Sequence, residues 1–172
     1  MLLSNALALV LFLAFGFFDR AFFPALSGGP WPVDSVLALG ILRMTSFASR
    51  GVALWMLCAA VTAEIFSEVG FSVAAAEMIV GLVSARLALY AIFSHKSIAA
   101  RALCGIVGIV VAMLVRGSMQ VAFGLLERSL VGVPQIGATA HAALAGAVWT
   151  SVFFCLLLFL LWFFERRLRR RS

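Results

Sequence analysis

The C-terminal part of the chain consists of an apolar run that ends in a cluster of arginines. Residues 142–164 contain no charged side chain, and a helix needs about 20 apolar residues to cross the core of a bilayer. Positive charge beside a spanning segment is retained on the cytoplasmic side. This junction predicts a membrane-spanning helix with a cytoplasmic C-terminus. The last seven residues supply the cluster: Arg166, Arg167, Arg169, Arg170 and Arg171.

The composition agrees with a membrane protein and excludes other classes. Hydrophobic residues make up 65% of the 172 residues, far above the roughly 45–50% of soluble domains. At about 20 residues per span, the length allows five or six spans and no added soluble domain. The net charge is +6, and most of the positive charge lies in short loops and the tail, so we expect no nucleic-acid partner.

Six apolar runs are separated by short polar stretches. The first could be a signal peptide, but no Lys or Arg precedes it, and Asp19-Arg20 follows where cleavage requires small residues. The second is the weakest, because it is short and Arg43 interrupts it. The runs are 2–18, 33–47, 51–66, 71–93, 102–126 and 140–164.

The distribution of Lys and Arg sets the orientation of these runs. With the C-terminus inside, only Arg20 and Arg128 fall in outer loops. This asymmetry predicts an all-α, six-transmembrane-helix bundle with both termini cytoplasmic, in the bacterial cytoplasmic (inner) membrane. The bundle forms one domain, 1–164, followed by a basic cytoplasmic tail, 165–172. If 33–47 does not cross, five spans remain and the N-terminus lies outside. The inner segments hold Arg43, Arg50, Lys96, Arg101 and the tail arginines.

The arginine tail has two interpretations. Each Lys or Arg near an anionic leaflet contributes about 1 kcal/mol of attraction, so we expect the tail to bind anionic lipids. Docking of the tail to a cytoplasmic protein is the alternative.

No group of residues has the spacing of a catalytic or metal site. His95 and His141 are expected on opposite sides of the membrane, and Cys58, Cys104 and Cys155 lie singly in apolar runs. The sequence contains no HExxH, CxxC, GxSxG or P-loop pattern. We therefore expect no enzyme, catalytic residue, metal or cofactor.

Three charges lie inside apolar runs, where ionisable residues are rare and often functional. Glu77 and Arg86 lie nine positions apart and so on opposite faces of one helix, whereas Glu77 and Arg116 can meet in the outer half of the membrane. We expect a structural ion pair between them, with an ion or ligand site as the alternative. Arg86 can snorkel to the inner surface.

Small and bulky residues mark different helix faces. Gly105, Gly108 and Ala112 share a stripe on the fifth run, and small residues at such spacing let helices approach closely. Residues 153–164 at the end of the sixth run are bulky on all sides and are expected to face lipid.

An acidic and serine-rich cluster lies between the third and fourth runs. Acids and serines are favoured at a helix start, so a capped N-terminus is one interpretation. The other is an exposed partner-binding surface. Its residues are Glu64, Ser67, Glu68, Phe71 and Ser72.

This cluster resembles the central signature of the rod shape-determining protein MreD family. Glu64, Ser67 and Phe71 match that signature, in which an acid, a serine, a bulky residue and a glycine follow the third span; Ser72 stands in place of the glycine and Glu64 in place of aspartate. The basic turn at 93–97 is also similar. The resemblance covers about residues 51–115.

The resemblance implies a non-enzymatic membrane component of the bacterial cell-wall elongation machinery. Its implied partner is a single-span MreC-like scaffold. The alternative is the substrate-binding subunit of an energy-coupling-factor-type vitamin transporter, whose small-molecule pocket would be formed by Glu64, Glu68, Trp31, Gln135 and His141.

Overall fold

The computed structural model describes residues 2–22, 24–25, 33–46, 52–65, 73–92, 97–127 and 136–169. Within these residues the chain is helical, with six α-helices and one π-helical turn, as the apolar runs predict. The elements are α1 (Leu2–Phe17), η1 (Phe18–Phe22), α3 (Ser35–Ser46), α4 (Val52–Ile65), α5 (Val73–Ile92), α6 (Ile98–Glu127) and α7 (Ile136–Arg169).

Three of these helices are long and apolar enough to cross a membrane. The qualifying segments are Val73–Ala91, Ile98–Phe123 and Gly137–Arg167, in α5, α6 and α7. The second apolar run forms α3, a helix of 12 residues and hence about 18 Å long. That is shorter than a bilayer core of about 30 Å. Helix α7 also continues through Arg169, so the start of the basic tail is an extension of the last helix.

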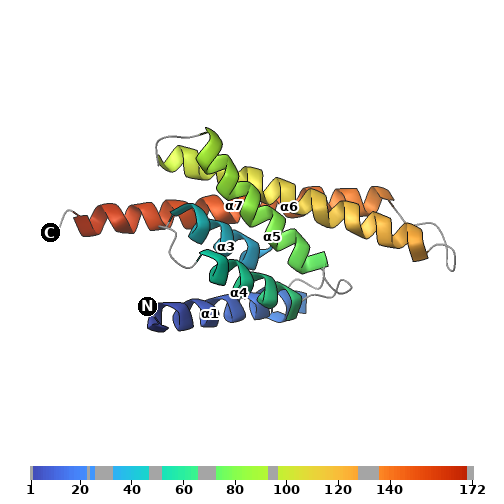
Figure 1. Ribbon diagram of the computed structural model, residues 1–172, viewed down its shortest axis with the longest axis horizontal. Helices are drawn as coiled ribbons and strands as arrows, with labels where there is room; N and C mark the ends of the chain where they lie inside the picture. Colours follow the sequence, from blue (N-terminus) through green and yellow to red (C-terminus); the bar gives the residue numbers. More distant parts are fainter. Residues whose placement is uncertain are drawn as a thin grey trace.

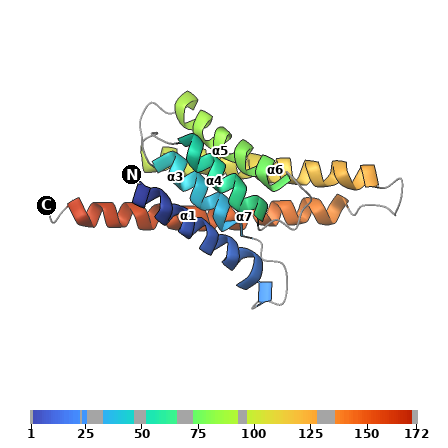
Figure 2. The ribbon, with the colours of Figure 1, turned by 60° about the horizontal axis from the view of Figure 1, so that its bottom comes forward.

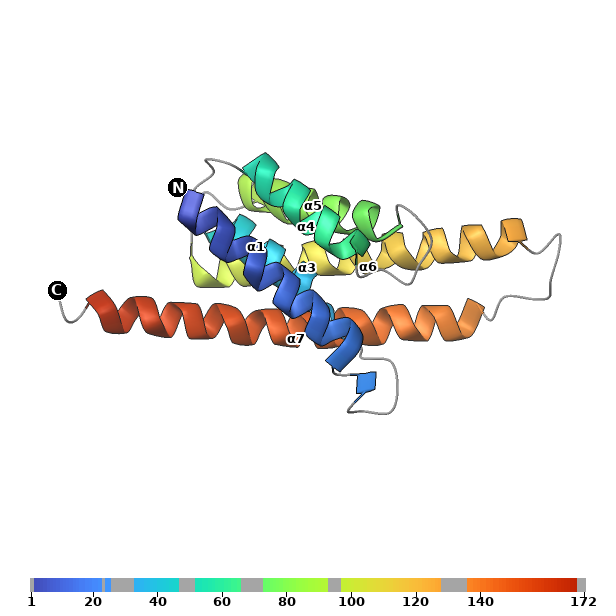
Figure 3. The ribbon, with the colours of Figure 1, turned by 90° about the horizontal axis from the view of Figure 1, so that it is seen from below.

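Successive helices run antiparallel. Gly16 and Asp19 near the end of α1, and Ala63 near the end of α4, surround one small cavity together with residues from the starts of α3 and α5. The long pair α6 and α7 lies side by side and extends beyond the shorter helices at one end (Figures 1 and 3). Figure 2 shows from another side that α6 and α7 extend beyond the shorter helices. The fold is thus a short-helix bundle attached to a longer helical hairpin.

Helix α3 lies at the centre of the bundle. It packs against α1, α4, α5, α6 and α7, and most of its residues are buried. A short helix can occupy this position because its small and aliphatic residues face neighbours on all sides. The weakest run of the sequence is therefore the structural centre. Its buried residues are Ser35, Val36, Leu37, Ala38, Gly40, Ile41, Met44 and Thr45.

Helices α5 and α6 pack backbone against backbone through glycine. A Cβ placed on Gly108 would lie 2.7 Å from both the Ala85 Cβ and the Gly81 carbonyl oxygen. A Cβ on Gly81 would lie 2.8 Å from the Ala112 Cβ. These distances are too short for carbon atoms, so the two backbones touch through glycine. The predicted small-residue stripe of the fifth run thus forms an intramolecular contact.

The bulky end of α7 is not entirely lipid-facing, contrary to the sequence expectation. Phe154 is fully buried and Leu158 nearly so. A Cβ on Gly105 would overlap the Phe154 ring, so this glycine creates the space that the ring fills. The reason is that α7 passes against α3 and α6, and one side of it must enter the core.

Substitution of Gly108 by alanine should destabilise the protein, whereas the same change at Gly117 should not. The Gly108→Ala methyl group forces α5 and α6 apart, and overpacking of this kind costs about 1–3 kcal/mol. A Cβ on Gly117 meets only the Ala143 Cβ at 3.5 Å, an ordinary contact. Gly117→Ala should therefore gain up to about 1 kcal/mol of helix propensity. Unfolding in mild detergent measures both, and equal stability of the two variants would contradict the close contact.

Candidate functional site

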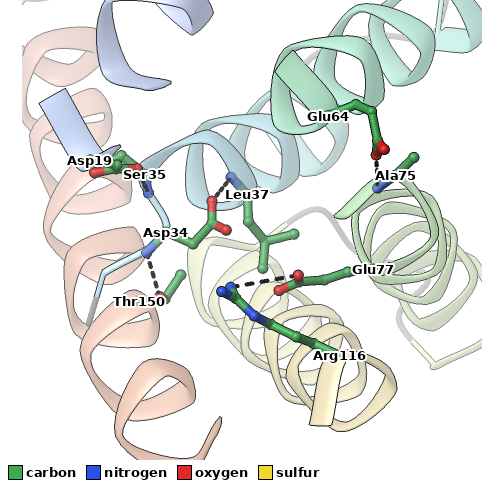
Figure 4. Close-up of polar contacts among 9 residues, drawn as sticks. All are labelled: Asp19, Asp34, Ser35, Leu37, Glu64, Ala75, Glu77, Arg116 and Thr150. Atoms are coloured by element: carbon green, nitrogen blue, oxygen red, sulfur yellow. Dashed lines mark hydrogen bonds and ion pairs between the residues drawn. The ribbon is translucent and has the colours of Figure 1, made fainter. Parts of the chain in front are cut away.

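Charged and polar side chains gather at one level of the bundle, around the N-terminus of α3 (Figure 4). They come from η1, α3, α4, α5, α6 and α7, so the level joins most of the helices. Backbone groups at helix ends lack partners within their own helix, and such groups are costly to bury unbonded. Much of this cluster supplies those partners.

Asp34 is the N-cap of α3. Its Oδ1 accepts a hydrogen bond from the Leu37 backbone N–H at 2.8 Å, the usual geometry of an N-cap acid. Its own backbone N–H donates to Thr150 Oγ1 at 2.9 Å. Thr150 is fully buried and lies on α7. One residue thus begins the central helix and attaches it to the last one.

Asp19 provides a second set of acceptors at the same helix end. Its Oδ2 accepts the Ser35 N–H at 2.5 Å, and its Oδ1 accepts the Ser35 hydroxyl at 2.7 Å. Both residues are buried, with Asp19 only 6% exposed. A carboxylate at a helix N-terminus is also favoured by the helix dipole. The π-helical turn that follows α1 therefore positions an acid against the start of α3.

Arg86 satisfies the other end of α3. Its Nη1 donates to the Met44 carbonyl oxygen at 2.7 Å, and its Nη2 donates to the Tyr90 hydroxyl at 2.6 Å. The guanidinium carbon also lies 4.6 Å from the centre of the Tyr90 ring. The sequence interpretation of Arg86, snorkelling to the inner surface, stays a prediction; the structure shows that the side chain bonds a carbonyl in the last turn of α3 and a tyrosine one turn further along α5.

Glu77 and Arg116 lie together, as an ion pair between α5 and α6. Glu77 Oε2 is 3.7 Å from Arg116 Nη1, and Glu77 is 4% exposed. Glu77 also lines the small cavity described above, with Asp19 and Asp34. The cavity holds about 20 Å³ of water-accessible space, which is room for about one water molecule. It is too small for a vitamin-sized ligand.

Glu64 has a structural partner in the fold. Its Oε2 accepts the Ala75 backbone N–H at 3.2 Å, so it caps α5 from the end of α4. The side chain is half-buried rather than exposed. This observation agrees with the capping interpretation for Glu64. The other predicted partner-binding residues lie outside the residues that the structure describes: Ser67, Glu68, Phe71 and Ser72.

The arginine tail begins on the last turns of α7. Arg166 and Arg167 are exposed, and the Arg166 guanidinium carbon lies 5.2 Å from the centre of the Trp162 ring. Arg169 is the last residue of the helix. Arg170 and Arg171 lie outside the described residues.

A second candidate site is an apolar groove between α6 and α7, hereafter the α6–α7 groove. It has a volume of about 890 Å³ and is built almost entirely from aliphatic and small side chains. Half of its lining residues are Gly, Ala, Ser or Thr. It is lined by Ile106, Val110, Met113, Leu114, Gly117, Ser118, Val121, Ala122, Thr139, Ala140, Ala143, Leu144, Ala147, Val148, Ser151 and Val152.

The described residues offer no metal-binding group, since no three His, Cys, Asp or Glu side chains among them are placed to hold an ion. His141 is exposed on α7, and neither His141 nor Glu64 lines the α6–α7 groove or the small acidic cavity. The vitamin pocket proposed from sequence also includes Trp31, Glu68 and Gln135, which the structure does not describe.

Sequence reasoning missed the polar residues that hold α3. Asp34-Ser35 directly precedes an apolar run, which is an N-cap signal that was available. Asp19 carried no signal beyond its charge. Thr150 carried none, because one hydroxyl in an apolar helix usually bonds its own backbone.

Comparison of the chain with protein-family models, with curated proteins and with solved structures finds no match.

Neutralising either partner of the Glu77–Arg116 pair should destabilise the protein. Glu77→Gln and Arg116→Gln each leave one buried or half-buried charge without its partner, at an expected cost of about 1–3 kcal/mol. The double variant should lose at least about 0.5 kcal/mol less than the sum of the single losses. Unfolding of all four proteins in detergent measures the difference. Additive losses would mean that the two charges act separately.

Proposed function

We propose that this protein is a non-enzymatic, multi-pass component of the bacterial cytoplasmic membrane that acts by binding partner membrane proteins. The proposed setting is the cell-wall elongation machinery, and the proposed partner is an MreC-like single-span scaffold. The setting and partner rest on the resemblance of residues 63–72 to the MreD signature. The mode of action rests on the α6–α7 groove.

The observation that carries the proposal is the projection of the α6–α7 hairpin beyond the shorter helices. Helix α6 continues through Glu127 past Arg116, a further distance of about 16 Å. Helix α7 begins at Ile136 and reaches the level of the α3 N-terminus only at Thr150, so its first turns also lie beyond that level. Beyond that level the hairpin remains apolar, with Phe123 and Leu144 exposed. In a bilayer such an uncovered apolar surface faces either lipid or a partner helix, and the side chains that line it decide between the two.

The lining of the groove favours a protein helix over lipid chains. Small residues such as Gly117, Ala140 and Ala143 permit close backbone contact between helices. The opposite end of α7 instead exposes Phe159, Phe163 and Phe164, which suit lipid. This difference between the small-residue groove and the phenylalanine-rich end of α7 is expected if the groove receives a partner helix and the other end faces lipid.

The short helices act as the base of this surface in the proposal. Helix α3 is bonded to α7 through Thr150 and packs against α6. The Glu77–Arg116 pair joins α5 to α6 near the point where the hairpin leaves the bundle. Because the hairpin is already held in place, binding of a partner at its groove does not require the conformational entropy loss of ordering the two helices.

The proposed topology has six crossings and both termini in the cytoplasm. The start of α1 and the end of α7 lie toward the same end of the bundle (Figure 3), which an even number of crossings requires. The asymmetry of Lys and Arg assigns Arg50 and Lys96, which lie outside the described residues, to that side as well. The exposed arginines of the tail contact anionic lipid there.

Accessibility of single cysteines tests this topology. In a chain without Cys58, Cys104 and Cys155, a cysteine at Ser172 should react only with membrane-permeant reagent in intact cells. A cysteine at Gly29 should react with impermeant reagent, because the segment between α1 and α3 is expected outside. Reaction of Ser172 from outside would overturn the orientation. Reaction of Gly29 only from inside would remove the crossing by α3.

Filling the α6–α7 groove should abolish scaffold binding without unfolding the protein. Ala143→Leu places a bulky side chain in the groove, whereas Ala91→Leu makes the same change at an exposed site on α5. We expect at least a tenfold loss of co-purified scaffold from Ala143→Leu, because a lost close contact of about 1.4 kcal/mol corresponds to tenfold. Ala91→Leu should retain it.

Two further results would decide against this surface. Equal recovery of the scaffold with both variants would exclude the groove. A Glu68→Lys variant that loses the scaffold while Ala143→Leu retains it would move the contact to the loop between α4 and α5. Co-purification of a vitamin with the wild-type protein would favour the transporter-subunit alternative.

A further inference from the structure

A pocket with two arginines lies at the opposite end of the α6–α7 pair, between the start of α6 and the end of α7. We refer to it as the basic pocket. It has a volume of about 540 Å³, and Arg101, Trp162, Glu165 and Arg166 supply its polar and aromatic lining. Unlike the α6–α7 groove, it combines charge with an apolar wall.

Arg101 is the inner cation of this pocket. It lies in the first turn of α6, and its side chain is half-buried. Its Nε is fully shielded from solvent and has no hydrogen-bond partner among the described residues. A buried guanidinium donor left unbonded is costly. Arg101 also lines the pocket, and the Nη groups beyond the shielded Nε can donate to an acceptor that enters it.

The start of α6 adds to the positive potential. Ser97 caps the helix, with its Oγ accepting the Ala100 backbone N–H at 3.1 Å. The N–H groups of a first turn and the helix dipole favour an anion near Ile98, which also lines the pocket. The dipole and the Arg101 side chain thus attract the same kind of ligand.

Arg166 and Trp162 form the outer edge. The guanidinium lies over the indole ring, which holds it in place through a cation–π contact. Both residues are exposed. Tryptophan is enriched at the boundary between lipid and water, so this edge is suited to the level of lipid headgroups.

The charge balance fits a singly charged ligand. Two arginines and one acid, Glu165, line the pocket, which leaves one positive charge. The remaining wall is apolar and consists of Ile98, Leu158 and Leu161. A site with one net positive charge beside an aliphatic wall matches an anionic headgroup joined to hydrocarbon chains.

We infer that the basic pocket binds the phosphodiester headgroup of an anionic phospholipid, with its acyl chains along the apolar wall. Arg101 and Arg166 contact the phosphate oxygens. This inference depends on the insertion of α6 and α7 in a bilayer, but not on the identity of any protein partner. It assigns a defined lipid site to one pocket, in addition to general attraction by the tail.

Titration of the purified full-length protein with phosphatidylglycerol, followed by native mass spectrometry, tests the site. Arg101→Gln should weaken binding about fivefold or more, since one such charge contributes about 1 kcal/mol. Arg50→Gln removes an equal charge from a segment expected on the same side of the membrane, and should change affinity less than twofold. Phosphatidylcholine, which has no net charge, should bind more weakly to the wild type.

Glu165→Gln provides a result that loss of folding cannot produce. Removing the acid from the pocket should raise the affinity for phosphatidylglycerol about threefold to fivefold. Equal losses from Arg101→Gln and Arg50→Gln would overturn the pocket in favour of general charge attraction. Competition by inorganic phosphate at the same concentration as the lipid would overturn the lipid assignment and indicate a free-anion site.

Discussion

The fold depends on the satisfaction of both ends of α3 by side chains from other helices. Asp34 and Asp19 bond the first N–H groups of this helix, and Arg86 bonds a carbonyl near its end. A helix of 12 residues leaves a large share of its backbone groups without internal partners. In the apolar interior of a membrane bundle, those groups need partners from the protein. Asp19, Asp34 and Arg86 therefore allow a short helix to be buried, whereas the Glu77–Arg116 pair joins two of the helices around it.

The two ends of the α6–α7 pair differ in chemistry because the bundle covers only part of its length. Where α3 and α5 pack against the pair, glycine and alanine bring backbones together, and Gly105 accommodates Phe154. Beyond that region, small residues line an uncovered groove. Near the end of α7, arginines and an aromatic ring replace these small residues on the surface of the pair. The same two helices thus offer an intramolecular face, a surface for a protein helix and a surface for lipid headgroups.

The helical runs could be predicted from sequence because each contains a continuous apolar stretch between polar breaks. The contact between Glu77 and Arg116 could be predicted from their similar depth in the membrane, because two opposite charges at one depth lower the free energy of burying each other. The central position of α3 could not be predicted, because hydropathy measures how well a segment suits lipid and α3 is surrounded by protein. Thr150 and the Met44 carbonyl partner of Arg86 were equally hidden, since these contacts join residues far apart in the chain.

The bond between Asp34 and Thr150 spans 116 positions of the chain, and this separation has a consequence for biosynthesis. A ribosome releases α3 long before it makes α7, so the Asp34 N–H has no Thr150 hydroxyl during most of translation. Arg86 also emerges after the α3 carbonyl that it bonds. Helix α3 is therefore expected to wait at the translocon or the membrane surface, and to take its central place only when the last helix arrives.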